Sequence, residues 1–149
     1  DAEFLVTFIG SWYDPPKAKE AAFAMIDAGA DIMYAERYGV SDAAVERDVL
    51  AIGNVIDTQD EYPGTILASA VWHMEPTVDL AIEKVLAEDY TAENYGPLSH
   101  LPVGGCSVAP MDDALVAADV QALVAKRQAA IMAGSLEVAV NDEEPVSTR

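Results

Sequence analysis

Short runs of apolar residues recur along the chain and alternate with longer stretches in which apolar and polar positions are mixed. The run at residues 3–9 (EFLVTFI) is rich in β-branched and aromatic side chains and ends at Gly10, which predicts a buried strand. Comparable runs predict further strands, over residues 31–35, 49–52, 65–71 and 103–109.

The stretches between these runs carry helix signals. Helices are predicted over residues 16–28, from residue 41 onward, over 74–87 and over 115–133. Asp14 precedes two prolines and marks the first helix start, and Gly29 and Gly134 are expected to end the first and last helices. The other expected N-caps are Ser41 or Asp42, and Asp112 or Asp113. The helix at residues 16–28 is expected to carry Ala18, Ala22, Met25 and Ile26 on one face, and the helix at 74–87 to carry Val78, Ile82 and Val85 on one side. Ala44 and Val45 are expected to point inward.

Strands that alternate with helices are typical of an α/β fold with a parallel sheet flanked by helices on both faces. We expect one compact domain, followed at residues 139–149 by a polar tail that is loose from Asn141. In open α/β sheets, ligands bind outside the carboxyl ends of the strands. That rule selects the loops at residues 10–14, 36–41, 54–61 and 72–75.

These loops hold flat aromatic side chains beside carboxylates and an amide. Tryptophan and tyrosine can stack on a planar ligand, and asparagine offers both a donor and an acceptor. A glycine lets the backbone approach a ligand closely. The candidate ligand-binding residues are Trp12, Tyr13, Asp14, Glu36, Tyr38, Gly39, Asn54, Asp57 and Trp72.

Three of these candidates have a structural alternative. Trp12 can instead pack beneath its own loop, because tryptophan is usually highly buried. Glu36 can pair with Arg37 on the surface. Asn54 can serve turn chemistry after a strand.

Composition narrows the classes of function. The chain has 26 acidic and 8 basic residues, a net charge of −18, which argues against nucleic-acid binding and against anionic membrane surfaces. A solubilising acidic surface is the simplest interpretation. Cys106 is the single cysteine and cannot form an internal disulfide. No apolar run approaches the roughly 20 residues of a membrane span, and the first residues do not resemble a signal peptide.

Catalysis finds little support in the motifs. Ser11 lacks the setting of a nucleophile elbow, Cys106 has no evident base, and no phosphate-binding glycine loop is present. His73 and His100 stand alone, so we expect structural roles for them and neither a metal nor another cofactor. We therefore predict a binding protein and not an enzyme.

The stretch at residues 8–22, together with the segments at 26–32, 51–57 and 69–72 that follow it in order, resembles the basic-membrane-protein (BMP) family of ABC-transporter substrate-binding proteins. The stretch at residues 8–22, FIGSWYDPPKAKEAA, is similar to the family's GSW-x-DP-x-K-x-KEAA signature. Residues 26–32, 51–57 and 69–72 fit the family in the same order, so the resemblance covers residues 3 to about 138.

This resemblance implies that residues 1–138 form one ligand-binding lobe of a type I periplasmic binding protein fold, with the family's first lobe expected before Asp1. It also implies a solute receptor, periplasmic or lipid-anchored, that delivers a purine nucleoside to an ABC permease. Two alternatives stay open: a sensor or regulatory domain of the same fold, and a small α/β enzyme. A lobe alone would expose Trp12, Tyr13 and Trp72, so we expect self-association of the isolated lobe.

The chain departs from the nucleoside-binding pattern at two positions. Relatives resemble Gly-x-Asp-x-Asp after the third strand, whereas Val55 takes the place of the first aspartate here, and Trp72 stands where some relatives have a lysine. A charged hydrogen bond contributes roughly 1.5–3 kcal/mol, so a sugar would lose its orienting partners. We therefore expect a purine-like free base such as adenine in preference to a nucleoside.

Overall fold

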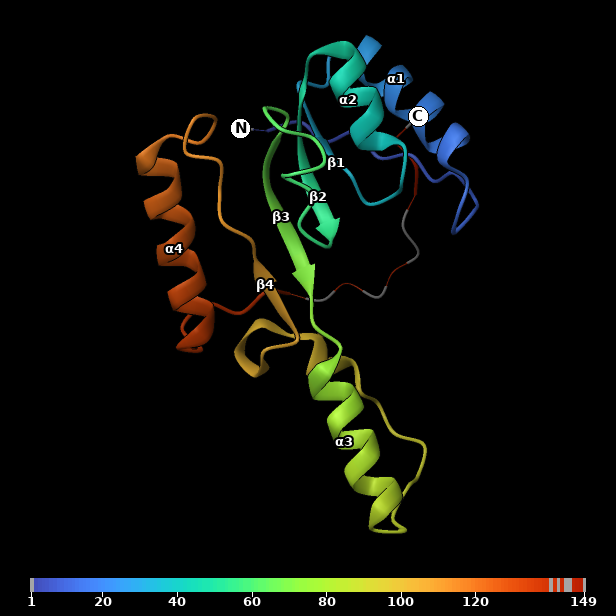
Figure 1. Ribbon diagram of the computed structural model, residues 1–149, viewed down its shortest axis with the longest axis vertical. Coiled ribbons are helices and arrows are strands. Elements are labelled where there is room, and N and C mark those ends of the chain that lie inside the picture. Colours follow the sequence, from blue (N-terminus) through green and yellow to red (C-terminus); the bar gives the residue numbers. More distant parts are fainter. Residues whose placement is uncertain (1, 140, 142, 144–145, 149) are drawn as a thin grey trace.

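The computed structural model describes residues 2–139, 141, 143 and 146–148, and its centre is a four-stranded sheet (Figure 1). The strands are β1 (Ile32–Tyr34), β2 (Leu50–Val55), β3 (Ile66–Trp72) and β4 (Cys106–Val108), in the order β1-β2-β3-β4. β1, β2 and β3 run parallel, which confirms the predicted α/β class.

The expectation of a wholly parallel sheet is wrong for β4, which is antiparallel to β3. Between the two strands lie α3 (Glu75–Leu86) and two 3-10 turns, at Gly96–Ser99 and Leu101–Val103. This excursion brings the chain back to the carboxyl end of β3, so that Cys106 pairs with Trp72 and the next strand must run in the reverse direction. β4 is also shorter than the strand predicted at residues 103–109. Val103 belongs to the second 3-10 turn, and Gly104 and Gly105 form the bend that follows it.

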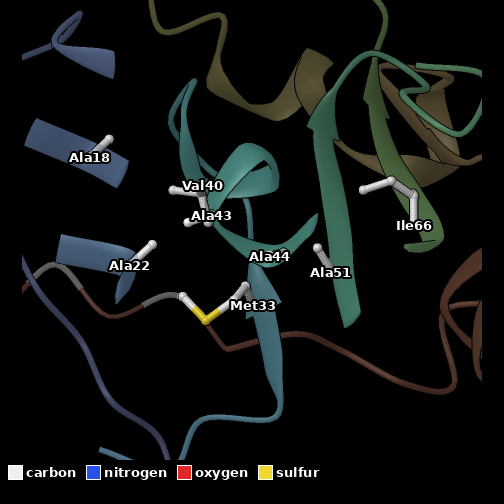
Figure 2. Close-up of a cluster of buried hydrophobic side chains, with 8 residues drawn as sticks. All are labelled: Ala18, Ala22, Met33, Val40, Ala43, Ala44, Ala51 and Ile66. Carbon is white, nitrogen blue, oxygen red and sulfur yellow. The ribbon is translucent and has the colours of Figure 1, made fainter. Parts of the chain in front are cut away.

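The core lies between the sheet and a pair of helices, α1 (Pro15–Asp27) and α2 (Val40–Arg47). Figure 2 shows its buried side chains, most of them alanines, which let the two helices and the sheet approach closely. Ala44 is buried as predicted, but Val45 is half-exposed, because the next residue of a helix points about 100° away. The buried apolar residues of this cluster are Ala18, Ala22, Met33, Val40, Ala43, Ala44, Ala51 and Ile66.

The helix starts agree with the sequence only in part. The Asp14 carboxylate accepts a hydrogen bond from the Lys17 amide at 3.1 Å and caps α1, as predicted. α2 begins after Gly39, with no side-chain cap from Ser41 or Asp42. The predicted caps for the last helix are also wrong: α4 (Ala118–Met132) begins after Ala117, whereas Asp112 accepts from the Ala114 amide and closes an earlier turn.

The predicted strand at residues 3–9 is wrong. The segment joins no strand of the sheet, and Phe4 and Phe8 are exposed. Its backbone bonds instead to the other end of the chain: the Thr148 amide donates to the Val6 carbonyl at 2.9 Å, and the Phe8 amide donates to Ser147 Oγ at 3.1 Å. The tail expected to be loose therefore makes contacts at these two residues, while positions 140, 142, 144–145 and 149 lie outside the described residues.

α3 does not pack on the sheet. In Figure 1 it extends beyond the end of β3, away from α1 and α2. Val78, Ile82 and Val85 do lie along one side of it, but each is half-exposed and no residue of α3 is buried. The prediction that these three side chains share one side of the helix is therefore confirmed, and that side is half-exposed.

Candidate functional site

A cavity of about 120 Å³ opens at the carboxyl ends of β1 and β2. Parallel strands bring their carboxyl ends to one edge, so the segments that follow β1 and β2 form its walls. The lining residues are Ala35, Glu36, Arg37, Tyr38, Gly39, Ser41, Gly53, Asn54, Val55, Ile56, Thr58, Glu61 and Tyr62.

Aromatic side chains from the first loop reach those of the second. The rings of Tyr13 and Tyr38 meet edge to face, with centroids 6.0 Å apart. The Arg37 guanidinium lies over the Trp12 ring, 4.9 Å from its centroid. Trp12 is 87% exposed, so it does not pack beneath its own loop. Two of the predicted loops thus form one aromatic group beside the cavity.

The positive charge of Arg37, beside the aromatic group, is balanced by the neighbouring Glu36 carboxylate. Arg37 Nη1 donates to the Glu36 carboxylate, so the predicted surface pair between these neighbours does form. With Arg37 also stacked on Trp12, no unpaired cation is left among the cavity's described lining residues, whereas Glu61 adds a second carboxylate. An anionic ligand would meet net negative charge here.

Gly39 has a close neighbour of its own. Its φ of +98° is left-handed, and a Cβ at this position would lie 2.3 Å from the Pro15 carbonyl oxygen. The start of α2 therefore contacts the first residue of α1. This contact gives Gly39 a packing role in addition to its place in the cavity wall.

Asn54 belongs to β2 and not to the loop after it. Its Oδ1 accepts a hydrogen bond from the Tyr34 hydroxyl at 3.0 Å, which leaves the amide nitrogen for another partner. Burial, and secondarily the Glu36 carboxylate, raise the pKa of the Tyr34 hydroxyl.

The Asp57 carboxylate is engaged by the protein itself. Its Oδ1 accepts from the Ser69 hydroxyl at 3.2 Å and from the Gln59 amide at 3.2 Å. Asp57 is absent from the cavity's lining residues, as are Trp12, Tyr13 and Asp14.

Trp72 ends β3 at the same edge of the sheet but does not line the cavity. Asn54 pairs with Ala70 in the register, so Trp72, two residues further on, lies on the same face of the sheet as Asn54. His73, which follows, lies with Nε2 2.8 Å from Ser107 Oγ on β4.

Sequence reasoning missed several lining residues, above all Tyr62. The Tyr62 hydroxyl donates to Asp42 at 3.3 Å, and burial, followed by the carboxylates of Asp42 and Glu61, raises the pKa of this hydroxyl to about 12. Tyr62 lies seven residues beyond the end of β2, so proximity to a strand end gave no signal. An aromatic residue between Glu61 and Pro63 was the only cue.

Two further observations concern the whole described chain. No helix among the described residues is long and apolar enough to cross a membrane. Nor do the described His, Cys, Asp and Glu side chains gather in groups of three or more that could hold a metal ion.

An open α/β sheet with a cavity at its strand ends is the arrangement of a small-molecule-binding lobe. The chain belongs to the Bmp family, described as ABC transporter substrate-binding protein PnrA-like, whose model matches residues 1–141. The resemblance read from the sequence is thereby confirmed.

Solved structures share the fold. A solute-binding protein of an ABC transporter system from Conexibacter woesei aligns at 24% identity over 89% of this chain and 45% of its own, with a TM-score of 0.61. One from Aeropyrum pernix aligns at 18% identity over 92% and 48%, with a TM-score of 0.67. A transcriptional activator of the comK gene from Bacillus halodurans aligns at 22% identity over 88% and 47%, with a TM-score of 0.72.

A curated relative matches a shorter stretch. A putative ABC transporter glucose-binding protein from Haloferax volcanii is 46% identical over 37 residues, which make up 25% of this chain and 10% of that protein. The chain thus spans less than half the length of the solved structures and a small part of this relative.

Proposed function

We propose that this chain is the ligand-binding lobe of an ABC importer's solute receptor and holds a small planar solute, a purine-like free base such as adenine, without chemical turnover. The observation that carries the proposal is the group of Trp12, Tyr13 and Tyr38 rings beside a cavity at the strand ends. Aromatic faces recognise flat heterocycles, and stacking contributes about 1–3 kcal/mol per base.

The size and polarity of the cavity support a small ligand. Its volume of about 120 Å³ lies below the roughly 300–1,000 Å³ of sites for drug-sized molecules. Val55 in its wall offers no hydrogen bond to a ribose hydroxyl. Asn54 and Glu36 supply a donor and an acceptor for the edge of a base.

The proposed contacts divide into two groups. Rings and polar side chains touch the ligand: Trp12, Tyr13, Glu36, Tyr38, Asn54 and, from the rim, Trp72. The remaining candidates hold the loops in place, since Asp14 caps α1, Gly39 lies against Pro15, and Asp57 bonds Ser69.

Delivery to a permease, closure of a second lobe over the ligand, and a periplasmic or lipid-anchored location belong to the same proposal and rest on family membership. A sensor role is the second candidate, because one structural neighbour is named a transcriptional activator. An output domain in the complete gene would favour that role. Self-association of the lobe through its exposed rings is also part of the proposal, and a monodisperse monomer by light scattering would contradict it.

Calorimetric titration of the chain with adenine, adenosine and glucose tests the proposal. We expect adenine to bind more tightly than adenosine, and glucose not to bind. Tighter adenosine binding would overturn the preference for a free base, and glucose binding alone would overturn the purine class.

A variant pair assigns the site. Tyr38→Ala removes a ring beside the cavity and should weaken adenine binding about tenfold, as expected for a stacked base. Tyr90→Ala removes an exposed tyrosine near the end of α3 and serves as the matched control. Equal losses in both variants would argue against a site beside Tyr38.

A further inference from the structure

The backbone of Val55 has an unusual conformation. Its φ is +74°, in the left-handed region, at the last residue of β2. A β-branched residue is a genuine outlier there, and such conformations cost of order 1–3 kcal/mol and persist only where the surroundings enforce them. Val55 lines the cavity and is 40% exposed, so it does not owe this conformation to core packing.

Hydrogen bonds from β3 hold the chain just after Val55. Ser69, which is fully buried, donates its hydroxyl to Asp57 Oδ1 at 3.2 Å and accepts from the Thr58 amide at 3.3 Å. Asp57 in turn accepts from the Gln59 amide. One buried hydroxyl thereby fixes two successive residues of the loop to the neighbouring strand.

Gly53 makes room for this arrangement. A Cβ on Gly53 would lie 2.3 Å from Ser69 Oγ and 2.5 Å from Thr58 Oγ1. The two hydroxyls therefore occupy the space above β2 that a side chain would otherwise fill. The loop can fold back over β2 only because residue 53 has no side chain.

We propose that Ser69 and Asp57 are positioning residues that hold Val55 in its left-handed conformation and so set the shape of the cavity wall at the end of β2. The pair also draws the Asp57 carboxylate toward β3. The wall then presents the apolar side chains of Val55 and Ile56 to a ligand. This inference rests on the proposed function only in assigning the wall to ligand binding.

The loop geometry can be tested without any ligand. By NMR, Val55 should show a strong intraresidue NOE between its amide proton and Hα, because a positive φ brings them close. In Ser69→Ala this signal should weaken, and amide exchange at Thr58 should speed up about tenfold, the factor for one lost hydrogen bond.

Two variants separate this effect from general damage. Asp57→Asn keeps an acceptor oxygen for the Ser69 hydroxyl, so this variant should keep the wild-type Val55 NOE and the wild-type exchange rate at Thr58. Ser107→Ala removes a hydrogen-bonded hydroxyl from β4 of the same sheet and should leave Thr58 unchanged. A Ser69→Ala protein that keeps both the Val55 signal and Thr58 protection would overturn the proposal.

A binding measurement adds a readout that a purely structural role would not give. Val55→Gly accepts the positive φ without strain, so its melting temperature should be unchanged or higher, whereas adenine affinity should fall several-fold as the wall loses its side chain. A parallel fall in stability and affinity would count against the proposal. If the wild-type chain binds no adenine, the adenine assignment fails, while the NMR and exchange data still decide the positioning role.

Discussion

The helices of this chain fall into two groups that look alike in sequence and differ in packing. α1 and α2 bury four alanines, a valine and a serine against each other and the sheet, whereas α3 and α4 contain no buried residue. Both groups have apolar side chains at helical spacing. Periodicity therefore predicts where a helix forms but not what, if anything, covers its apolar side.

Charge separates the two groups further, and salt should have the largest effect. Residues 75–93 carry six acidic side chains and one basic one, Lys84, which pairs with Glu93 at 2.6 Å and leaves five carboxylates in excess. Two ion pairs of 2.6 and 2.8 Å, Lys19–Glu46 and Arg47–Asp27, link α1 to α2. Raising salt from 0.1 to 1 M shortens the screening length from about 10 to about 3 Å and relieves repulsion.

We therefore expect α3 to lose most of its amide-exchange protection in dilute buffer and to recover it in concentrated potassium chloride, while α1 changes little. Hydrogen exchange with residue resolution measures this directly. If the amide protection of α1 and α3 responded equally to salt, the proposed electrostatic difference between the two groups of helices would be refuted.

Truncating one isoleucine in each region should give the next largest difference. Ile66 is fully buried on β3, and Ile66→Ala should cost about 2–5 kcal/mol of unfolding free energy through lost contacts and a cavity. Ile82 on α3 is 52% exposed, and Ile82→Ala should cost less than about 0.5 kcal/mol. Urea denaturation compares the two, and a large loss at Ile82 would reveal packing of α3 that the described contacts do not account for.

Helix capping offers a smaller contrast. Asp14→Ala removes the side-chain cap of α1 and should cost about 1 kcal/mol. Ala117 already has the extended backbone of an N-cap, φ −61° and ψ 146°, so Ala117→Ser should stabilise α4 by up to about 1 kcal/mol. Thermal melts of both variants test the signs, and a destabilised Ala117→Ser protein would be inconsistent with the described start of α4.

Alkaline pH should act through one tyrosine that contacts α2. The pKa of Tyr62 is raised from 10.0 to about 12, so the folded state holds this proton more tightly than the unfolded chain does. The stabilisation is complete below pH 10 and should be lost as pH rises from 10 toward 12. Tyr62→Phe should show a flatter pH profile in urea melts, and identical profiles would refute the coupling.

The sequence predicted the parts of the fold that depend on local pattern. β1 to β3, α1 with its Asp14 cap, and α3 lie within a residue or a few of their predicted bounds. The failures have non-local causes. The strand at residues 3–9 needs a neighbouring strand, and the direction of β4 depends on the path taken between residues 73 and 105.

The candidate site was predictable to the extent that it follows strand ends. Glu36, Tyr38, Gly39 and Asn54 line the cavity because they stand at or after the carboxyl ends of β1 and β2. Tyr62 and Ser69 were missed because their roles arise from a loop folding back over β2. Whether the nine candidates contact a ligand stays a prediction.

The contact between Gly39 and Pro15 has a mechanical consequence. It ties together two helix starts, and each of these starts carries one of the aromatic loops. The rings of Tyr13 and Tyr38 should consequently move together. A bound ligand that displaces either ring should then shift the starts of both helices through the contact between Gly39 and Pro15.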